Sequence, residues 1–315
     1  MACRDELSSC ATSPFLRITD ADNSTSSCRW PLAELCLKTC GECPRVTAAR
    51  LCASLADECS WEFCDGESVS WRRFFARVVA DAPAGARILS EEKPWVAEFP
   101  GFLSDAEADE IIRIGTSVGF RREDDLDDRV RNVSVNNCDS VHCIGQPFIN
   151  ELYARVSRLL RLPARNFESM EFLHYERGQH YTWHRDEFGW KASSPEPAMV
   201  LAGPRVLTLF FYLSDVQHGG ETAFAGAPHD TKISDSRFGS SRVVPSLLVR
   251  PQRGKAIMWA NMADEWHMSE PASSHRALPV EQGTKWAATL WVHASGFRIP
   301  EMYAGPECSV RPPLQ

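Results

Sequence analysis

Residues 174–187 read HYERGQHYTWHRDE, and this stretch decides how the 315-residue chain is interpreted. His184 and Asp186 are separated by one residue, so on an extended strand both side chains lie on the same face. An imidazole and a carboxylate placed in this way, with one distant histidine, form the facial triad of non-haem Fe(II) sites. A zinc protease site is the first alternative, because His180 and His184 stand four residues apart. That motif needs a Glu directly after the first histidine, and Tyr181 stands there, which excludes it.

The third ligand of such a triad has to come from a histidine further along the chain. The candidates are His218, His229, His267, His275 and His293. The context favours His275, because Lys285 follows ten residues later on a strand-like run. A dicarboxylate co-substrate such as 2-oxoglutarate chelates the metal at one end, and a buried lysine supplies the salt bridge for its far carboxylate. His267 is the alternative.

The pattern around this stretch predicts a mixed domain. Ser104 and Glu107 form a capping box, which predicts that a helix begins there. A second helix is predicted from about Phe148 to the residues before Pro163, because its apolar residues recur on one face. Short runs rich in β-branched and aromatic residues then follow at 168–175, 206–213, 256–260 and 285–293. Helices followed by strands indicate an α+β domain with an antiparallel sandwich or barrel.

The motifs of residues 92–298 resemble those of the prolyl 4-hydroxylase family of 2-oxoglutarate-dependent dioxygenases. They occur in order as Y-x2-G-Q-x-Y-x2-H-x-D at 175–186, RVLTLFFYLSDVQHGGETAF at 205–224 and H-x9-K-W at 275–286. The resemblance implies a double-stranded β-helix (jelly-roll) core flanked by helices. It also implies that His184, Asp186 and His275 bind Fe(II), and that Lys285 binds the far carboxylate of 2-oxoglutarate, with ascorbate as reductant.

The resemblance assigns further residues to the two ligands. Tyr175 and Thr208 match positions that help hold the co-substrate, and Arg131, Tyr181 and Trp291 match positions that line the peptide groove.

Three segments depart from the usual pattern of the family. They are the loop at 131–134, the residues 276–278 after the distal histidine, and an insertion around 225–247. We expect these departures to affect peptide preference and not the metal chemistry.

Nine of the 12 cysteines lie within the first 64 residues, which is typical of a disulfide framework formed in an oxidising compartment. The alternative is a cytosolic protein with reduced thiols. The spacing at the two ends of residues 1–45 resembles the ShK-toxin-like module, and this implies the pairs Cys3–Cys43, Cys10–Cys36 and Cys28–Cys40. Around 40 residues bury too little surface to fold unaided, so bridges would stabilise this segment.

The remaining cysteines allow one local bridge. Cys138 and Cys143 are close enough to pair, which would leave Cys308 for one of the cysteines at 52, 59 or 64; the alternative is two or more free thiols. We therefore divide the chain into an ShK-like module (1–45), a cysteine-containing linker (46–91), the dioxygenase domain (92–298) and a tail (299–315). No signal peptide is visible at the start, which we expect to be incomplete, and we expect the secretory pathway, the endoplasmic reticulum lumen or the exterior as location.

The overall composition limits the possible partners. The net charge of -8 argues against a nucleic-acid binder, and no apolar run reaches the ~18 residues of a membrane span. The resemblance implies a peptidyl-proline 4-hydroxylase acting on Pro-rich or collagen-like polypeptides, with release of succinate and CO2. Two alternatives stay open: hydroxylation of another residue such as lysine, and a non-catalytic secreted binding protein that acts through its cysteine module.

Overall fold

The computed structural model describes residues 70–122, 131–187, 204–225, 245–264, 269–293 and 297, with two short strands before them. These strands are β1 (Arg17–Ile18) and β2 (Ser27–Cys28), and they pair antiparallel. Apart from them, the predicted ShK-like module lies outside the described residues, as do most of its linker and the C-terminal tail. The four domain boundaries therefore stay predictions.

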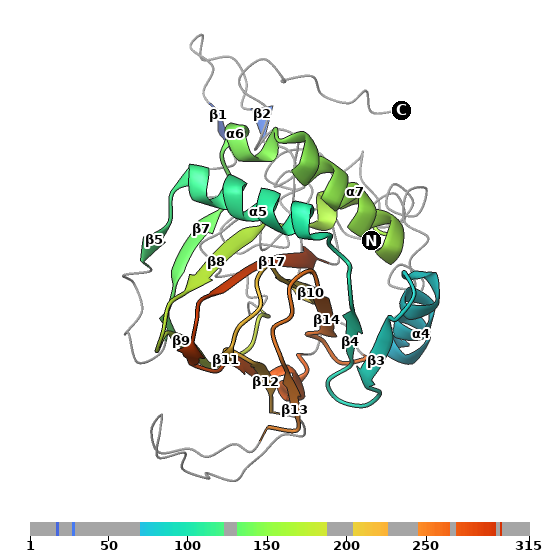
Figure 1. The fold of residues 1–315 in the computed structure, drawn as a ribbon. Coiled ribbons are helices and arrows are strands. Elements are labelled where there is room, and N and C mark those ends of the chain that lie inside the picture. The colour runs from blue at the N-terminus through green and yellow to red at the C-terminus, as the bar shows by residue number, and fades with distance from the viewer. Residues whose placement is uncertain are drawn as a thin grey trace.

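A large antiparallel sheet of eight strands forms the centre of the domain (Figure 1). Its order is β3–β4–β14–β10–β17–β8–β7–β5. The strands are β3 (Arg87–Ser90), β4 (Val96–Phe99), β5 (Arg121–Arg122), β7 (Ser134–Asn137), β8 (Glu171–Tyr175), β10 (Arg205–Tyr212), β14 (Ala256–Ala260) and β17 (Lys285–His293). All neighbouring strands in it are antiparallel, as the sequence predicts.

A smaller sheet of five strands lies on the other side of the large sheet from helix α5 (Figure 1). Its order is β13–β12–β15–β9–β6, and a two-stranded ribbon, β11–β16, accompanies it. The strands are β6 (Arg131–Asn132), β9 (His180–His184), β11 (His218–Gly219), β12 (Thr222–Phe224), β13 (Leu247–Val249), β15 (His275–Ala277) and β16 (Val280–Gln282). Apolar residues of both sheets share one core, so the two sheets pack face to face. This arrangement agrees with the predicted jelly roll.

Helices cover the outer face of the large sheet (Figure 1). They are α4 (Trp71–Asp81), α5 (Asp105–Val118), α6 (Val141–Ile144) and α7 (Pro147–Leu160). Two 3-10 turns are also present: η1 (Ala164–Asn166) follows α7, and η2 (Pro271–Ser273) precedes β15. The predicted capping box is present at the start of α5, where Ser104 and Glu107 bond each other's backbone N–H groups. The second predicted helix is α7, and it ends at Arg161, which has a φ of 56°. None of the described helices is long and apolar enough to span a membrane.

Strand β10 shows how the core positions the site. Its eight residues are all buried, and apart from Arg205 and Thr208 they are apolar or aromatic, so apolar and polar residues do not alternate along it. Leu209 and Phe211 pack into the core under the helices, whereas Phe210 and Tyr212 belong to the core between the sheets. Because side chains alternate along a strand, Thr208 shares the inner face with Phe210 and Tyr212. Thr208 therefore faces the space between the two sheets, where the residues of the site described below lie.

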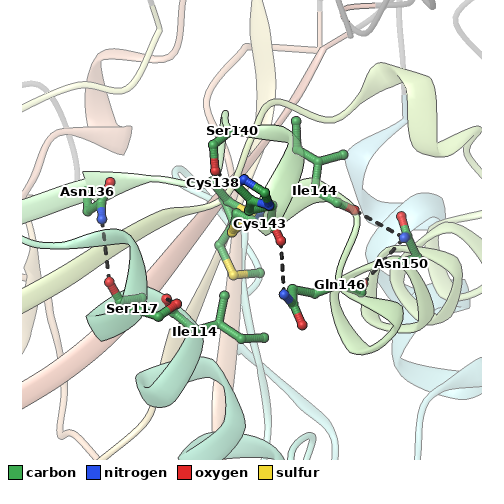
Figure 2. The surroundings of a disulfide bond; sticks show 12 residues. Ile114, Ser117, Asn136, Cys138, Ser140, Cys143, Ile144, Gln146 and Asn150 are labelled. Atoms are coloured by element: carbon green, nitrogen blue, oxygen red, sulfur yellow. Dashed lines mark hydrogen bonds between the residues drawn. A yellow bond between two sulfur atoms is a disulfide. The ribbon is translucent and has the colours of Figure 1, made fainter. Parts of the chain in front are cut away.

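The structure contains a disulfide between Cys138 and Cys143, which confirms the predicted local bridge. Figure 2 shows it where the chain leaves β7 and enters α6. Both half-cystines are buried in the core under the helices, and the backbone N–H of Cys138 donates to the carbonyl of Met170. The bridge therefore anchors the loop between the large sheet and α7. The other ten cysteines lie in parts of the chain for which the structure describes no side chains.

Candidate metal and co-substrate site

Strands β9 and β15 bring the two predicted histidine ligands together. The two strands pair so that His184 is directly opposite His275, and the ring centroids are 4.3 Å apart. Asp186 follows β9 and directs Oδ1 at both rings, 3.8 Å from Nε2 of His184 and 3.7 Å from Nε2 of His275. Potential ligand atoms of the three residues all lie within 4.8 Å of one another. The structure thus joins the three predicted metal ligands in one cluster.

Hydrogen bonds orient both imidazoles for metal binding. Nδ1 of His184 lies 2.7 Å from the carbonyl oxygen of Thr182, and Nδ1 of His275 lies 2.9 Å from that of Ser273. In each case the ring N–H donates to the carbonyl, so Nε2 carries the free lone pair. This is how protein backbones usually fix the tautomer of a metal-binding histidine.

The electrostatics of the cluster suit a divalent cation. Burial, followed by the neighbouring His275, lowers the pKa of His184 to about 3, so this imidazole is neutral at physiological pH. Burial alone would raise the pKa of Asp186, but the two histidines and a hydrogen bond from Thr208 hold it below its ordinary value. Two imidazole nitrogens and one carboxylate form the donor set that non-haem Fe(II) prefers.

The other candidates for the third ligand do not reach this cluster within the described structure. His218 lies on β11 with an exposed side chain, and His293 bonds Glu168. His229 and the runner-up His267 lie outside the described residues.

Lys285 lies against the aromatic residues of the inner face of the large sheet. It is fully buried, and its Nζ donates to the carbonyl oxygen of Gly220 at 2.9 Å. Aromatic rings surround the ammonium group, with Tyr175 and Phe210 centred 5.1 Å away and Tyr212 centred 5.5 Å away. Burial lowers the pKa of Lys285 to about 7, while Glu221 opposes the shift. A buried ammonium group that bonds one carbonyl and no carboxylate within the described chain fits a carboxylate ligand.

The metal cluster and Lys285 belong to the same space between the sheets. The ring of Trp259 contacts His275 at a centroid distance of 4.7 Å and lies 6.5 Å from Phe210, which in turn contacts Lys285. The residues present therefore fit a co-substrate with a metal-chelating end and a distal carboxylate.

The two predicted co-substrate residues have different surroundings. Tyr175 pairs with Lys285 in the register of β8 and β17, beside the ammonium group. The hydroxyl of Thr208 instead donates to Oδ2 of Asp186 at 2.7 Å, so it lies at the metal end. The co-substrate role of Thr208 stays a prediction.

Thr222, which sequence reasoning missed, bonds a tyrosine that faces Lys285. It is buried, and its Oγ1 lies 2.7 Å from the hydroxyl oxygen of Tyr212, whose ring faces Lys285. The preceding Gly219 and Gly220 have φ values of 76° and 72°, and a Cβ on Gly219 would lie 2.2 Å from the carbonyl oxygen of Pro279. The glycine pair in HGGET is therefore the sequence signal that could have located this turn.

The predicted peptide-groove residues Arg131 and Tyr181 lie against the metal cluster. Register pairs them across β6 and β9, and the guanidinium carbon of Arg131 stands 4.7 Å from the ring centroid of Tyr181. The Tyr181 ring in turn stacks on His184 with centroids 3.6 Å apart. A bond of 3.0 Å from Arg131 to Glu171 holds the guanidinium group in place. Arg131, Tyr181 and His184 thus form one stack beside the metal ligands.

Trp291, the third predicted groove residue, adjoins a buried ionic network that sequence reasoning missed. Arg205 lies over its ring at 3.7 Å and forms two bonds to the carboxylate of Glu168. His293 approaches the same carboxylate at 2.7 Å, and Arg205 also donates to the backbone carbonyl of Asp186 at 3.4 Å. The network therefore connects the C-terminal end of β17 to the segment that carries Asp186.

Comparison with known proteins gives a family match and several relatives. The family described as the 2OG-Fe(II) oxygenase superfamily matches residues 170–293. Prolyl 4-hydroxylase 2 of Arabidopsis thaliana is 29% identical over 212 residues, which are 65% of this chain and 69% of the relative. Probable prolyl 4-hydroxylase 6 of the same plant is 30% identical over 207 residues, which are 63% of this chain and 69% of the relative.

A solved structure was also matched, that of the viral collagen prolyl hydroxylase of Paramecium Bursaria Chlorella virus-1 with 2-oxoglutarate. It is 22% identical with a TM-score of 0.46, covering 63% of this chain and 96% of the viral one. From the extent and identity of the plant matches, the chain belongs to the prolyl 4-hydroxylase family of 2OG-Fe(II) oxygenases.

Proposed function

We propose that this protein is a peptidyl-proline 4-hydroxylase that uses Fe(II), O2 and 2-oxoglutarate. The observation that carries the proposal is the cluster of His184, Asp186 and His275 on the same inner space as the buried ammonium group of Lys285. In the reaction, one oxygen atom of O2 enters the prolyl ring as hydroxyl. The other enters succinate as 2-oxoglutarate loses CO2.

The residues of this chain would position the reactants. His184, Asp186 and His275 would hold Fe(II), which supplies the redox chemistry that couples decarboxylation to hydroxylation. Lys285 would bind the distal carboxylate of 2-oxoglutarate, with Tyr175 and Tyr212 beside it and Thr222 bonded to the Tyr212 hydroxyl. The aromatic core around Trp259 and Phe210 would exclude water from the reacting centre. Ascorbate would serve as the reductant that keeps the iron ferrous.

The peptide groove would lie along Arg131, Tyr181 and Trp291. Pro-rich segments adopt the polyproline II conformation and dock on aromatic side chains, which Tyr181 and Trp291 provide. Tyr181 stacks on a metal ligand, so a prolyl ring bound against it would lie next to the metal. Proline-rich or collagen-like polypeptides are therefore the proposed substrates.

The proposed location is the secretory pathway, in the endoplasmic reticulum lumen or beyond. A buried disulfide between Cys138 and Cys143 supports an oxidising compartment. The crowded cysteines of residues 1–64 agree with this location. We propose that the ShK-like module localises the enzyme or positions its substrate.

The test is succinate release from 2-oxoglutarate with Fe(II), ascorbate and a polyproline or collagen-like Pro-Pro-Gly peptide, with mass spectrometry of the peptide. We expect peptide-dependent succinate and a gain of one oxygen on proline. Asp186→Ala should abolish both, because it removes the carboxylate ligand. Oxygen found on lysine in a mixed peptide, or no turnover with either peptide despite metal binding, would contradict the proposal.

A further inference from the structure

The two oxygens of the Asp186 carboxylate have different partners. Oδ1 faces Nε2 of His184 and Nε2 of His275. Oδ2 accepts a hydrogen bond of 2.7 Å from the hydroxyl of Thr208 on the neighbouring strand β10. Both residues are buried, so water does not compete for this bond. The carboxylate therefore presents one oxygen to the metal position and keeps the other on a protein donor.

Asp186 and Asn261 together fix the hydrogen-bond directions at the Thr208 hydroxyl. Nδ2 of Asn261 lies 2.8 Å from Oγ1 of Thr208. A hydroxyl has one hydrogen, and an ionised carboxylate can only accept, so the Thr208 hydrogen must lie on Asp186. Thr208 Oγ1 then accepts from the Asn261 amide, which assigns the amide nitrogen to this position. The three residues form a directed chain, from Asn261 to Thr208 to Asp186.

The hydrogen-bond chain begins at Asn261, whose backbone is held by two hydrogen bonds. Asn261 is completely buried just after β14, its backbone N–H donates to Val206 at 3.0 Å, and its carbonyl accepts from Glu270 at 3.0 Å. Its Oδ1 has no hydrogen-bond partner within the described structure. An unsatisfied buried amide oxygen is costly. This cost makes sense if the orientation of Nδ2 toward Thr208 serves the site.

We infer that Asn261 and Thr208 are positioning residues that keep Asp186 a one-oxygen ligand. A carboxylate free to rotate could bring both oxygens to the metal and fill a position that the chelating end of the co-substrate needs. The hydrogen-bond relay from Asn261 through Thr208 to Asp186 prevents this, because Oδ2 is already bonded to Thr208. The inference rests on the proposed function only in assuming that Fe(II) and 2-oxoglutarate bind here, and it gives Thr208 a role through Asp186.

The test measures binding, without turnover. Co(II) replaces Fe(II), and the visible absorption of Co(II) reports metal binding and then 2-oxoglutarate binding to the loaded protein. Thr208→Val removes the hydroxyl at nearly constant volume, and Thr208→Ser restores it. Tyr153→Phe is the control, because its hydroxyl bonds the backbone N–H of Met170, in the core under the helices.

We expect Thr208→Val to keep its Co(II) affinity and to lose about 10–100-fold in 2-oxoglutarate affinity, the range typical for residues behind metal ligands. Thr208→Ser should recover most of this loss. Asn261→Ala should show a smaller loss, because Thr208 can still reach Asp186. Tyr153→Phe should lower the melting temperature and leave both affinities unchanged.

Two outcomes would overturn the inference. One is a Thr208→Val protein with wild-type affinity for both ligands. The other is weakened Co(II) binding with unchanged 2-oxoglutarate affinity, which would indicate general support of the ligand. If the wild-type protein binds both ligands but hydroxylates no proline peptide, the proposed function fails. In that case the comparison of 2-oxoglutarate affinity in the Thr208→Val and Thr208→Ser variants still tests whether the relay positions Asp186.

Discussion

The ammonium nitrogen of Lys285 lies 2.9 Å from the carbonyl oxygen of Gly220, and within the described parts of the chain this lysine forms no ion pair. A charged group that is fully buried with one neutral acceptor costs free energy that a ligand carboxylate would offset. This relationship makes Lys285 the most informative residue for testing the co-substrate site.

Replacement of Lys285 by alanine should weaken 2-oxoglutarate binding by ~2–5 kcal/mol, because one partner of a buried charge pair is lost. Titration of the metal-loaded protein with 2-oxoglutarate measures this. Lys255→Ala is the matched control, because Lys255 is also buried near Tyr212 but lies 3.7 Å from the carboxylate of Glu98. The control should lose stability and keep its affinity. An unchanged affinity of Lys285→Ala for 2-oxoglutarate would show that Lys285 does not bind this ligand.

The affinity for 2-oxoglutarate should depend on pH through the same lysine. Burial lowers the pKa of Lys285 to about 7 in the free protein, and a bound carboxylate would raise it. Below pH 7 the lysine is already charged, so affinity should be flat. Above pH 7 binding requires proton uptake, and affinity should fall by up to about tenfold per pH unit. Calorimetry in two buffers with different ionisation enthalpies would detect the proton, and a constant affinity between about pH 6 and pH 9 would contradict the mechanism.

Tyr181 should contribute to peptide binding. Its ring stacks on His184 at 3.6 Å under Arg131, so an aromatic side chain is needed to keep the stack. We expect Tyr181→Ala to raise the peptide KM about 2–10-fold, which corresponds to the free energy of one aromatic contact. Tyr181→Phe should stay close to wild type. Steady-state kinetics at saturating 2-oxoglutarate measure this, and equal KM values for both variants would show that the ring does not contact peptide.

The network around Glu168 should stabilise the fold. Its carboxylate bonds Arg205 and His293, and all three side chains are buried. Glu168→Ala removes the buried carboxylate that pairs with Arg205 and His293, which should reduce the free energy of unfolding by ~3–5 kcal/mol. Urea unfolding measures the loss. Glu110→Ala removes an ion pair with Arg113 on the surface of α5 and should change little. Similar values for the two variants would contradict this reading of the network.

The disulfide should contribute to stability. It closes a short loop between Cys138 and Cys143, and the chain-entropy relation gives about 2 kcal/mol for a loop of this size. The double variant Cys138→Ser, Cys143→Ser should unfold at lower urea. The comparison is wild-type protein unfolded in the presence of a reductant, and its urea midpoint should approach that of the double variant. A variant as stable as the oxidised protein would exclude a stabilising role.

The features that local sequence determines were predicted correctly. The capping box of Ser104 and Glu107 needs only residues three apart, and the structure contains both of its hydrogen bonds. The proximity of His184 to Asp186 and the bridge from Cys138 to Cys143 likewise depend on short spacings. In each case the interacting groups are held by the chain between them, so their geometry can be inferred without the rest of the fold. The prediction that both ligands lie on one extended strand was wrong for Asp186, because β9 ends at His184 and Asp186 lies in the bend that follows.

Long-range contacts were harder to predict from spacing. His275 could be selected among five histidines only through Lys285 and the family resemblance, whereas in the structure the register of β9 and β15 places it opposite His184. Thr208 and Thr222 are both buried threonines on the inner faces, and the sequence does not distinguish the one at Asp186 from the one near Lys285.

The sequence by itself determined the helix start, the strand runs, the type of metal ligand and the local disulfide, because periodicity and short spacings encode them. Only the tertiary structure decided which residues from distant parts of the sequence meet. These are the relay from Asn261, the aromatic surroundings of Lys285, and the network of Glu168, Arg205 and His293. The physical reason is that strand register and sheet packing are set by the whole buried core. A residue's partner on another strand is therefore fixed by burial and hydrogen bonding summed over both sheets.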